Sequence, residues 1–293
     1  MVAAPVRTRS VLAALRPAHW SKNFLVFLPL VLHGDWDCVD SWVRAAGTFA
    51  AMCLAASSLY LLNDLRDAGG RQLLRRPNPV EDGGLGRRIV WRLAAVLFAA
   101  ALVVSVPFQV TPWIAGYGLL SGAYTWRLKE LAVIDLLALG SLYLLRLEAG
   151  GAATGIPVTD WTRVVCGGAL FSLALVKRVA ELRLAGLSGL DRIPRRAYTP
   201  SDARRLMTAG LMVLAAAVVA FLVFLQQFGG PQGLNRRGWA LVAGLIATMW
   251  ALRMWRLAWM GRMRSDPVVF TLSDRTSWIA VLAGLAAYIL AIE

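Results

Sequence analysis

The acidic residues whose spacing best suits chemistry lie in the stretch Ser58-Leu-Tyr-Leu-Leu-Asn63-Asp64-Leu-Arg66-Asp67. Asn63 and Asp67 are four residues apart, and Asp64 and Asp67 are three apart, so a helix would place these oxygens on one face. Hard oxygen ligands grouped in this way suit Mg²⁺, which keeps several waters and is completed by substrate phosphates. The alternative is the ordinary solvated end of a helix, and the stretch by itself leaves both interpretations open.

A second stretch, Lys177-Arg178-Val-Ala-Glu181-Leu-Arg183, combines cations with one carboxylate. Lys177 and Glu181 are four apart, and Arg178 and Glu181 are three apart, so one helix face would carry all three groups. Such a face could hold phosphate oxygens, with Arg178 able to bind them in a bidentate manner. An intrahelical ion pair beside charges that only set membrane orientation would explain the same residues.

Three ionisable residues, Asp135, Arg146 and Glu148, lie inside a single apolar run. Ionisable groups within a membrane span usually face the bundle interior and are functional candidates. Arg146 and Glu148 are two residues apart and do not face each other on a helix. Both lie near the expected outer end of their span, where they could simply reach water. Asp135 lies near the inner end, beside the two polar stretches, and is the stronger candidate.

The overall composition indicates a membrane protein. The 293 residues are 58% hydrophobic and 16% charged, with a mean hydropathy of +0.59, whereas soluble domains are about 25% charged. The net charge of +14 would suit a nucleic-acid binder. The basic residues, however, form short clusters between apolar runs, as Lys and Arg do in cytoplasmic loops, so no nucleic-acid partner is expected. The cysteines and histidines show no metal-binding or disulfide spacing.

The apolar runs predict an all-α integral membrane bundle of about nine transmembrane helices, forming a single domain over residues 1–293. A span needs about 20 mostly apolar residues. Candidates lie near 24–40, 45–62, 89–107, 111–126, 131–149, 162–180, 206–228, 237–256 and 276–292, the first weakened by Pro29 and Gly34. With a cytoplasmic N-terminus and an external C-terminus, the outer connections hold only Arg44, Arg163, Arg236 and Arg237. This asymmetry predicts that the polar stretches face the cytoplasm.

At this point the order and spacing of the motifs resemble the UbiA superfamily of membrane prenyltransferases, over nearly the whole chain. Asn63-Asp64-x-x-Asp67 is similar to the first aspartate-rich motif of that family. Other stretches are similar to its bacterial branch of polyprenyl-phosphate (decaprenyl-phosphate) phosphoribosyltransferases. These are Arg16-Pro-x-x-Trp20-x-Lys22-Asn23, Tyr124-Thr-Trp-Arg127-Leu-Lys129, Val133-Ile-Asp135, Arg146-x-x-Ala-Gly-Gly151, Leu175-Val-Lys177-Arg178-x-Ala-Glu181-Leu and Asp266-Pro-Val-Val-Phe270.

The resemblance implies Mg²⁺-assisted transfer with a diphosphate leaving group, at the cytoplasmic face of a bacterial inner membrane. In the phosphoribosyltransferase branch, a polyprenyl phosphate attacks the anomeric carbon of phosphoribosyl pyrophosphate, and its chain lies in the helix bundle among membrane lipids. Asn63, Asp64 and Asp67 would hold Mg²⁺ on the diphosphate-bearing donor. The candidate catalytic residues are Asp64, Asp67, Asp135 and Glu181. The candidate substrate-binding residues are Lys22, Asn23, Arg66, Arg71, Tyr124, Arg127, Lys129, Lys177, Arg178 and Tyr198.

One feature of the resemblance favours phosphoribosyl over prenyl transfer, because Lys177-Arg178-x-x-Glu181 stands where ordinary prenyltransferases of the family carry a second aspartate run. Two departures keep other functions open. The position of the third aspartate of the first motif is Arg71 here, and the loop Gln72-Leu-Leu-Arg75-Arg76-Pro77-Asn78-Pro79 is shortened. The alternatives are a prenyltransferase with an aromatic or other acceptor, a degenerate member that binds only lipid or a partner, and a transporter.

Overall fold

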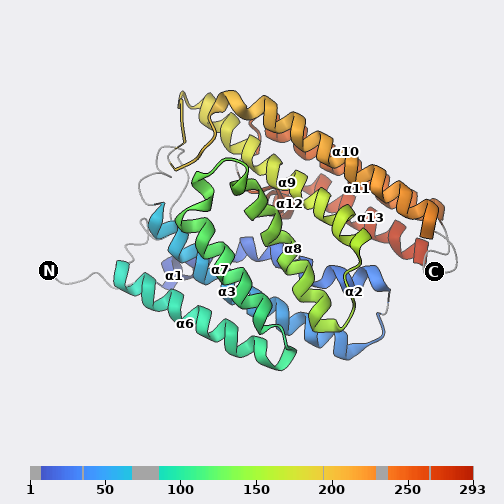
Figure 1. Cartoon of the computed structure of the whole chain (residues 1–293), viewed down its shortest axis with the longest axis horizontal. Helices are drawn as coiled ribbons and strands as arrows, with labels where there is room; N and C mark the ends of the chain where they lie inside the picture. The colour runs from blue at the N-terminus through green and yellow to red at the C-terminus, as the bar shows by residue number, and fades with distance from the viewer. Residues whose placement is uncertain are drawn as a thin grey trace. The chain divides into compact units, whose positions relative to one another are not determined.

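The computed structural model describes residues 8–34, 36–67, 86–193, 195–228, 237–263 and 265–292, and these ranges contain helices and no strand. The helices in Figure 1 belong to two compact units. Unit 1 comprises Met1–Pro157 and Ile193–Ala197, and unit 2 comprises Val158–Arg192 and Tyr198–Glu293. A single domain over the whole chain stays a prediction.

Six of the described helical segments are long and apolar enough to cross a membrane, judged by length and composition. They are Val39–Arg66, Arg87–Phe108, Ile134–Thr154, Pro200–Gln227, Arg237–Trp259 and Arg275–Ile292. An all-α, multi-pass membrane protein is therefore confirmed. The count of nine spans and the sides of the two termini stay predictions.

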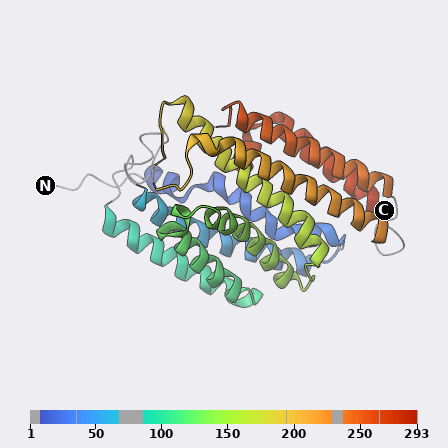
Figure 2. The same ribbon diagram turned by 45° about the horizontal axis from the view of Figure 1, so that its top comes forward.

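Unit 1 is built around the helix α3, whose small buried side chains let its neighbours approach closely. Its elements are α1 (Thr8–Leu15), the 3₁₀ helix η1 (Pro17–Phe27), α2 (Leu28–His33), α3 (Val39–Arg66), α6 (Arg87–Ser105), η2 (Val106–Phe108), α7 (Thr111–Trp126), η3 (Leu128–Glu130) and α8 (Ile134–Thr154). α3 packs against η1, α6, α7 and α8, and Figures 1 and 2 show α6 running beside it. Ala51, Ala55 and Ala56 are fully buried on α3. Small residues of this kind favour close helix packing in membranes.

The expected span at 24–40 is wrong as one continuous helix. The segment is 3₁₀-helical in η1, becomes α-helical at Leu28 and ends at Gly34, which has a φ of 82°. Pro29 lies in the first turn of α2, where its missing N–H is tolerated, and Gly34 takes the left-handed conformation that ends a helix. The other eight expected spans each coincide with a helix: α3, α6, α7, α8, α9, α10, α11 and α13.

Unit 2 is a second helical bundle, in which a tryptophan packs over a glycine. Its elements are α9 (Asp160–Leu187), η4 (Pro200–Asp202), α10 (Ala203–Phe228), α11 (Arg237–Trp259), α12 (Pro267–Ser273) and α13 (Arg275–Ile292). α9 packs against α10 and α11. Trp255 donates from Nε1 to Ser172 Oγ at 3.0 Å, and Ser172 donates to the Gly210 carbonyl at 2.9 Å. A Cβ at Gly210 would lie 2.1 Å from the Trp255 ring, so this packing requires glycine.

An ion pair ties α11 to the start of α13. Arg253 donates from Nη1 to Asp274 Oδ2 at 2.7 Å and from Nη2 to Oδ1 at 2.9 Å, and the Ser277 N–H also donates to Oδ2. The hydrogen bonds from Arg253 are the main reason why the pKa of Asp274 falls to about 2. Because this folded-state pKa is depressed, the pair stabilises the fold above the ordinary aspartate pKa of about 4. That contribution is lost as the pH falls toward 2.

Gly150 of α8 lies directly against the backbone of η1. A Cβ at this position would be 2.0 Å from the Val26 carbonyl oxygen. A side chain could relieve such a clash by changing rotamer, but a backbone carbonyl cannot. We expect Gly150→Ala to lower stability by about 1–3 kcal/mol, the usual cost of overpacking. Gly116→Ala in α7 is the control, because its Cβ would meet nothing within 4 Å. Thermal unfolding of the two variants in one detergent checks the prediction, and equal melting temperatures would contradict it.

Candidate active site

The acidic stretch lies at the C-terminal end of α3, where cations from two other segments hold its oxygens. Lys129 of η3 donates from Nζ to Asn63 Oδ1 at 3.1 Å and also to Asp67 Oδ1. Arg16 Nε lies 2.8 Å from Asp64 Oδ2. Asn63 and Asp67 thus face one cation, as their spacing predicts, whereas Asp64, one position further round the helix, faces another. We call these five residues the α3 polar cluster.

The α3 polar cluster is largely removed from solvent. The side chains of Asp64 and Lys129 are 0% and 1% exposed, and that of Asp67 is 17% exposed. Burial lowers the pKa of Lys129, and the charge of the Asp67 carboxylate opposes that shift. Buried charges are costly unless they are paired. Two carboxylates are here matched by two cations, so the cluster is balanced by the chain's own residues.

Arg16 reaches Asp64 because the segment around it is fastened to the same face of α3. Arg16 has a φ of 54°, a left-handed conformation that is uncommon outside glycine. The preceding carbonyl, of Leu15, accepts a hydrogen bond from Ser57 Oγ at 2.9 Å, and Ser57 accepts from Trp20 Nε1 at 2.9 Å. Ser57 and Asp64 are seven residues apart, or about two helical turns. One face of α3 therefore carries both the anchor and the ionic partner of this segment.

Asp135 is fully buried at the start of α8, where it meets a tyrosine and an arginine. Tyr124 donates from its hydroxyl to Asp135 Oδ1 at 3.0 Å. Arg196 Nη1 donates to the Tyr124 hydroxyl at 3.2 Å and lies 3.9 Å from Asp135 Oδ1. The structure therefore brings together two predicted residues, Asp135 and Tyr124, and adds Arg196, which was not among the predicted site residues.

The turn that precedes Asp135 is strained. Val133 has a φ of 65° and a ψ of −50°, and the Ile134 N–H donates to the Ala132 carbonyl at 2.7 Å. This is a three-residue γ-turn of the rare kind, centred on a β-branched residue. Such strain costs about 1–3 kcal/mol and clusters at functional sites. The strained turn lies two residues before Asp135, at the start of α8.

Arg66, the last residue of α3, contacts other segments of unit 1 through both its backbone and its side chain. Its Nη2 donates to the Trp126 carbonyl at 2.6 Å and lies 3.8 Å from Glu130 Oε1. Its own carbonyl accepts a hydrogen bond from Arg195 Nη1. The short segment Ile193–Ala197 therefore brings two arginines to this end of unit 1.

Asn23 lies in a different part of unit 1 from the acidic stretch. It accepts a hydrogen bond from Arg146 Nε at 2.8 Å and donates to Cys53 Sγ at 3.2 Å. Cys53 precedes Asp64 by eleven residues on α3, or about 16 Å along the axis. The expectation that Arg146 could reach water is wrong, because it is 3% exposed and donates to the Tyr117 hydroxyl at 3.0 Å.

The remaining predicted residues of unit 1 differ in their surroundings. Lys22, beside Asn23 on η1, is 7% exposed. Arg127 is exposed at the end of α7. Arg71 and the shortened loop at 72–79 lie outside the described residues. The substrate-binding roles of these residues stay predictions.

In unit 2, the stretch on α9 forms two ion pairs. Arg178, which is fully buried, pairs with Glu181 one turn away. Lys177 Nζ lies 3.7 Å from Asp266 Oδ2, and Asp266 caps α12 by accepting from the Val268 N–H. Lys177 therefore pairs with Asp266, and Glu181 pairs with Arg178. Tyr198 is also buried in this unit. The α3 and α9 stretches lie in different units, and a shared active site stays a prediction.

Among the charged residues that contact predicted site residues within each unit, Arg16, Arg195, Arg196 and Asp266 were not themselves predicted as site residues. Arg16 and Asp266 belong to motifs that carried the resemblance, so a signal for them was present. Arg195 and Arg196 form a basic pair in the connection between α9 and α10, which is also what positive-inside charge would produce. Their approach to Arg66 and Tyr124 depends on contacts more than 70 residues apart in the chain.

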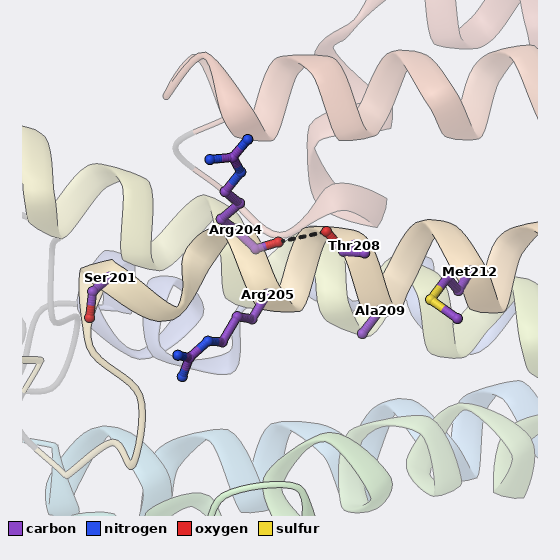
Figure 3. Close-up of a pocket in the computed structure, with 6 residues that line it drawn as sticks. All are labelled: Ser201, Arg204, Arg205, Thr208, Ala209 and Met212. Carbon is purple, nitrogen blue, oxygen red and sulfur yellow. Dashed lines mark hydrogen bonds between the residues drawn. The ribbon is translucent and has the colours of Figure 1, made fainter.

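A hollow of about 570 Å³ lies on the first turns of α10 in unit 2 (Figure 3). Its lining is Ser201, Arg204, Arg205, Thr208, Ala209 and Met212. Figure 3 shows the Arg204 and Arg205 side chains pointing in opposite directions. None of the predicted site residues lines this hollow.

The α3 polar cluster fits a hard cation that takes most of its ligands from elsewhere. Asn63 Oδ1 and Asp67 Oδ1 already converge on one cationic centre, the Lys129 ammonium. Amide and carboxylate oxygens are ligands that Mg²⁺ accepts, together with water and phosphate. Within the described residues, no three His, Cys, Asp or Glu side chains converge as a metal site. The donor set therefore suits Mg²⁺ only with further oxygens from water or substrate.

The fold and this site define a multi-pass, all-α membrane protein with a buried, cation-rich polar cluster at one helix end. No protein-family model matches the sequence. The chain is 36% identical over 223 residues to a decaprenyl-phosphate phosphoribosyltransferase of Mycolicibacterium smegmatis, covering 72% of this chain and 70% of that protein. It is 31% identical over 296 residues to the Mycobacterium tuberculosis enzyme of that name, covering 95% and 94%. The chain belongs to the UbiA superfamily, near this branch.

Two further similarities concern length and fold. The chain is 30% identical to protein y4nM of Sinorhizobium fredii over 96% of its own residues, but spans only about half, 55%, of that longer relative. A UbiA homologue from Archaeoglobus fulgidus, solved with DMAPP and Mg²⁺, has a TM-score of 0.68 at 16% identity, covering 95% of this chain and 99% of that one. This likeness establishes the fold.

Proposed function

We propose that this chain transfers phosphoribose from phosphoribosyl pyrophosphate to a polyprenyl phosphate. The observation that carries the proposal is its near full-length identity to the M. tuberculosis phosphoribosyltransferase, 31% over 95% of this chain. The stretch Lys177-Arg178-x-x-Glu181 adds support, since ordinary prenyltransferases of the family carry aspartates there.

In this reaction, the bond from the anomeric carbon to the diphosphate breaks, and a bond to a phosphate oxygen of the lipid forms. Asn63, Asp64 and Asp67 would hold Mg²⁺, which supplies charge neutralisation on the leaving diphosphate. The chain's own contribution is then positioning and positive charge, as expected for the transfer of phosphorylated groups. Arg16, Lys129 and Arg196 would provide that charge around α3.

The contacts of the remaining candidate residues suggest a role for each of them. Asp135 holds the Tyr124 hydroxyl, and together they would orient Arg196 toward the donor. Lys177 and Arg178 would bind phosphate oxygens on the α9 side, with Glu181 fixing the guanidinium of Arg178. Lys22, Asn23, Arg66, Arg71, Arg127 and Tyr198 stay candidate substrate contacts.

Prenyl transfer from an isoprenoid diphosphate is the second candidate. It is favoured by the fold shared with the A. fulgidus homologue, which was solved with DMAPP and Mg²⁺. The replacement of the second aspartate run by Lys177-Arg178-x-x-Glu181 counts against it.

Product analysis separates the candidates. Purified protein is given polyprenyl phosphate, Mg²⁺ and either phosphoribosyl pyrophosphate or an isoprenoid diphosphate, and the lipids are measured by mass spectrometry. We expect a lipid heavier by one phosphoribosyl group only with phosphoribosyl pyrophosphate. A prenylated product would support the second candidate, and lipid binding without any product would indicate a degenerate member.

We also propose nine spans in a bacterial inner membrane, with the N-terminus and the polar stretches in the cytoplasm and the C-terminus outside. The support is the strong bias of Lys and Arg toward one side. In a background lacking Cys38, Cys53 and Cys166, a cysteine at position 75 should label from the cytoplasm and one at 160 from outside. Labelling of both from one side would exclude this topology.

A further inference from the structure

We propose that Lys129 is a tethered counter-ion, which fills the cation position between Asn63 and Asp67 in the absence of metal and yields it when Mg²⁺ enters. The inference rests on the proposed function in taking Mg²⁺ to be bound by these residues. It assigns Lys129 a role in metal binding as well as in substrate binding.

The geometry is that of a bound cation. The Lys129 ammonium bridges two different side chains, 3.1 Å from Asn63 Oδ1 and hydrogen-bonded to Asp67 Oδ1. These partners lie more than 60 residues away in sequence, so the contact is made by folding and not by a local helix pair. The Lys129 side chain is 1% exposed, so these oxygens take the place of the water that would otherwise surround its ammonium group. Such a placement persists only when the oxygens replace that hydration.

An ammonium and Mg²⁺ cannot share these oxygens. Mg²⁺ requires oxygens at about 2.0–2.1 Å in an octahedral shell, whereas an ammonium holds them at hydrogen-bond distance. Both cations on one oxygen pair would lie only a few ångströms apart, where like charges repel strongly at reduced dielectric. Occupation by one cation therefore excludes the other.

The charges around the α3 polar cluster indicate that a negatively charged donor accompanies the replacement of Lys129 by Mg²⁺. Asp64 is paired with Arg16, and Asp67 with Lys129, so two cations balance the two carboxylates of the cluster. Arg195 and Arg196 lie close enough to repel the Lys129 charge. Mg²⁺ by itself would add charge to a site that already holds these cations. A diphosphate donor brings the negative charge that both the metal and the released Lys129 require.

This device predicts that Mg²⁺ binds weakly by itself because it must displace Lys129. The test measures the affinity for Mg²⁺ alone, by calorimetry on the detergent-purified full chain without donor. Lys129→Met removes the competing charge and should bind Mg²⁺ about tenfold or more tightly than the unchanged protein. Lys129→Arg keeps the charge and should bind Mg²⁺ as weakly as the unchanged protein.

Stability provides a readout that is independent of turnover. In EDTA, Lys129→Met should melt below the unchanged protein, because Asp67 has lost its counter-ion. Saturating Mg²⁺ should raise its melting temperature by more than it raises that of the unchanged protein, since a ligand stabilises the state that binds it. Lys129→Gln, which keeps an N–H donor without the charge, is the second neutral variant in case the methionine variant does not fold.

Arg44→Met is the matched control for general loss of charge. Arg44 forms an ion pair with Asp40 at the opposite end of α3, 2.7 Å from Nε to Oδ2, and both side chains are exposed. Its removal should leave Mg²⁺ affinity unchanged. The proposal is overturned if neither neutral variant at Lys129 binds Mg²⁺ more tightly, or if Arg44→Met produces the same gain. Since no donor is used, these outcomes are separate from the product assay that tests phosphoribosyl transfer.

Discussion

Asp67→Asn is expected to lower turnover by at least about a thousandfold, which corresponds to about 4 kcal/mol of lost transition-state stabilisation. The substitution keeps the size of the side chain but removes a negative oxygen ligand from the cation position shared with Asn63. The leaving diphosphate would then lose much of the metal charge that stabilises it. Binding of the polyprenyl phosphate should change little, because its chain is held by apolar helix faces.

Initial rates from lipid mass spectrometry, together with lipid binding measured on the same protein, check this prediction. Asp40→Asn is the matched control, since it makes the same substitution at the exposed, opposite end of α3. We expect its rate to equal that of the unchanged protein. Unchanged turnover in Asp67→Asn would sink the metal-assisted mechanism.

Arg178→Met is expected to give the largest loss of stability, about 3–5 kcal/mol, which is typical when one partner of a buried ion pair is removed. Arg178 is fully buried and pairs with Glu181, whose side chain is 9% exposed. Without the guanidinium, the Glu181 carboxylate would be left buried and uncompensated by its present partner. The double variant Arg178→Met with Glu181→Gln should recover much of the loss, because the buried charge is removed as well.

Thermal unfolding in detergent measures both effects. The control is Arg163→Met on the same helix, which breaks a pair of identical spacing with Asp160 at 2.7 Å. Both side chains of that pair are exposed, at 45% and 94%, so the expected change is only about 0–1 kcal/mol. A melting temperature of Arg178→Met as high as that of Arg163→Met would show that the α9 pair does not stabilise the fold.

Local sequence was enough to predict most helices of this chain, because a membrane span needs only a long apolar run. α10 and α13 coincide with such runs to within a few residues. The run at 24–40 failed for an equally local reason, since Pro29 and Gly34 interrupt it. The packing of this segment, however, involves a distant part of the chain. η1 lies against Gly150 of α8, a contact between residues more than 120 positions apart.

For the candidate site too, some features could be predicted from local sequence and others could not. Spacing within one helix predicted that Asn63 and Asp67 lie on one face, and it offered an ion pair of Glu181 within its own helix as one of two interpretations, since helical geometry makes residues three or four apart neighbours. It could not predict that Lys129 would be the cation between Asn63 and Asp67.

The sequence by itself determined that this protein is a helical membrane protein, to which family it belongs and which helix ends carry its polar groups. These properties depend on apolar length, on charge asymmetry and on spacing within single helices. Only the tertiary structure decided which cation meets which carboxylate: Arg16 with Asp64, Lys129 with Asp67 and Arg196 near Asp135. Each of these contacts joins residues at least 48 positions apart, and their choice depends on how helices pack, which no local pattern encodes.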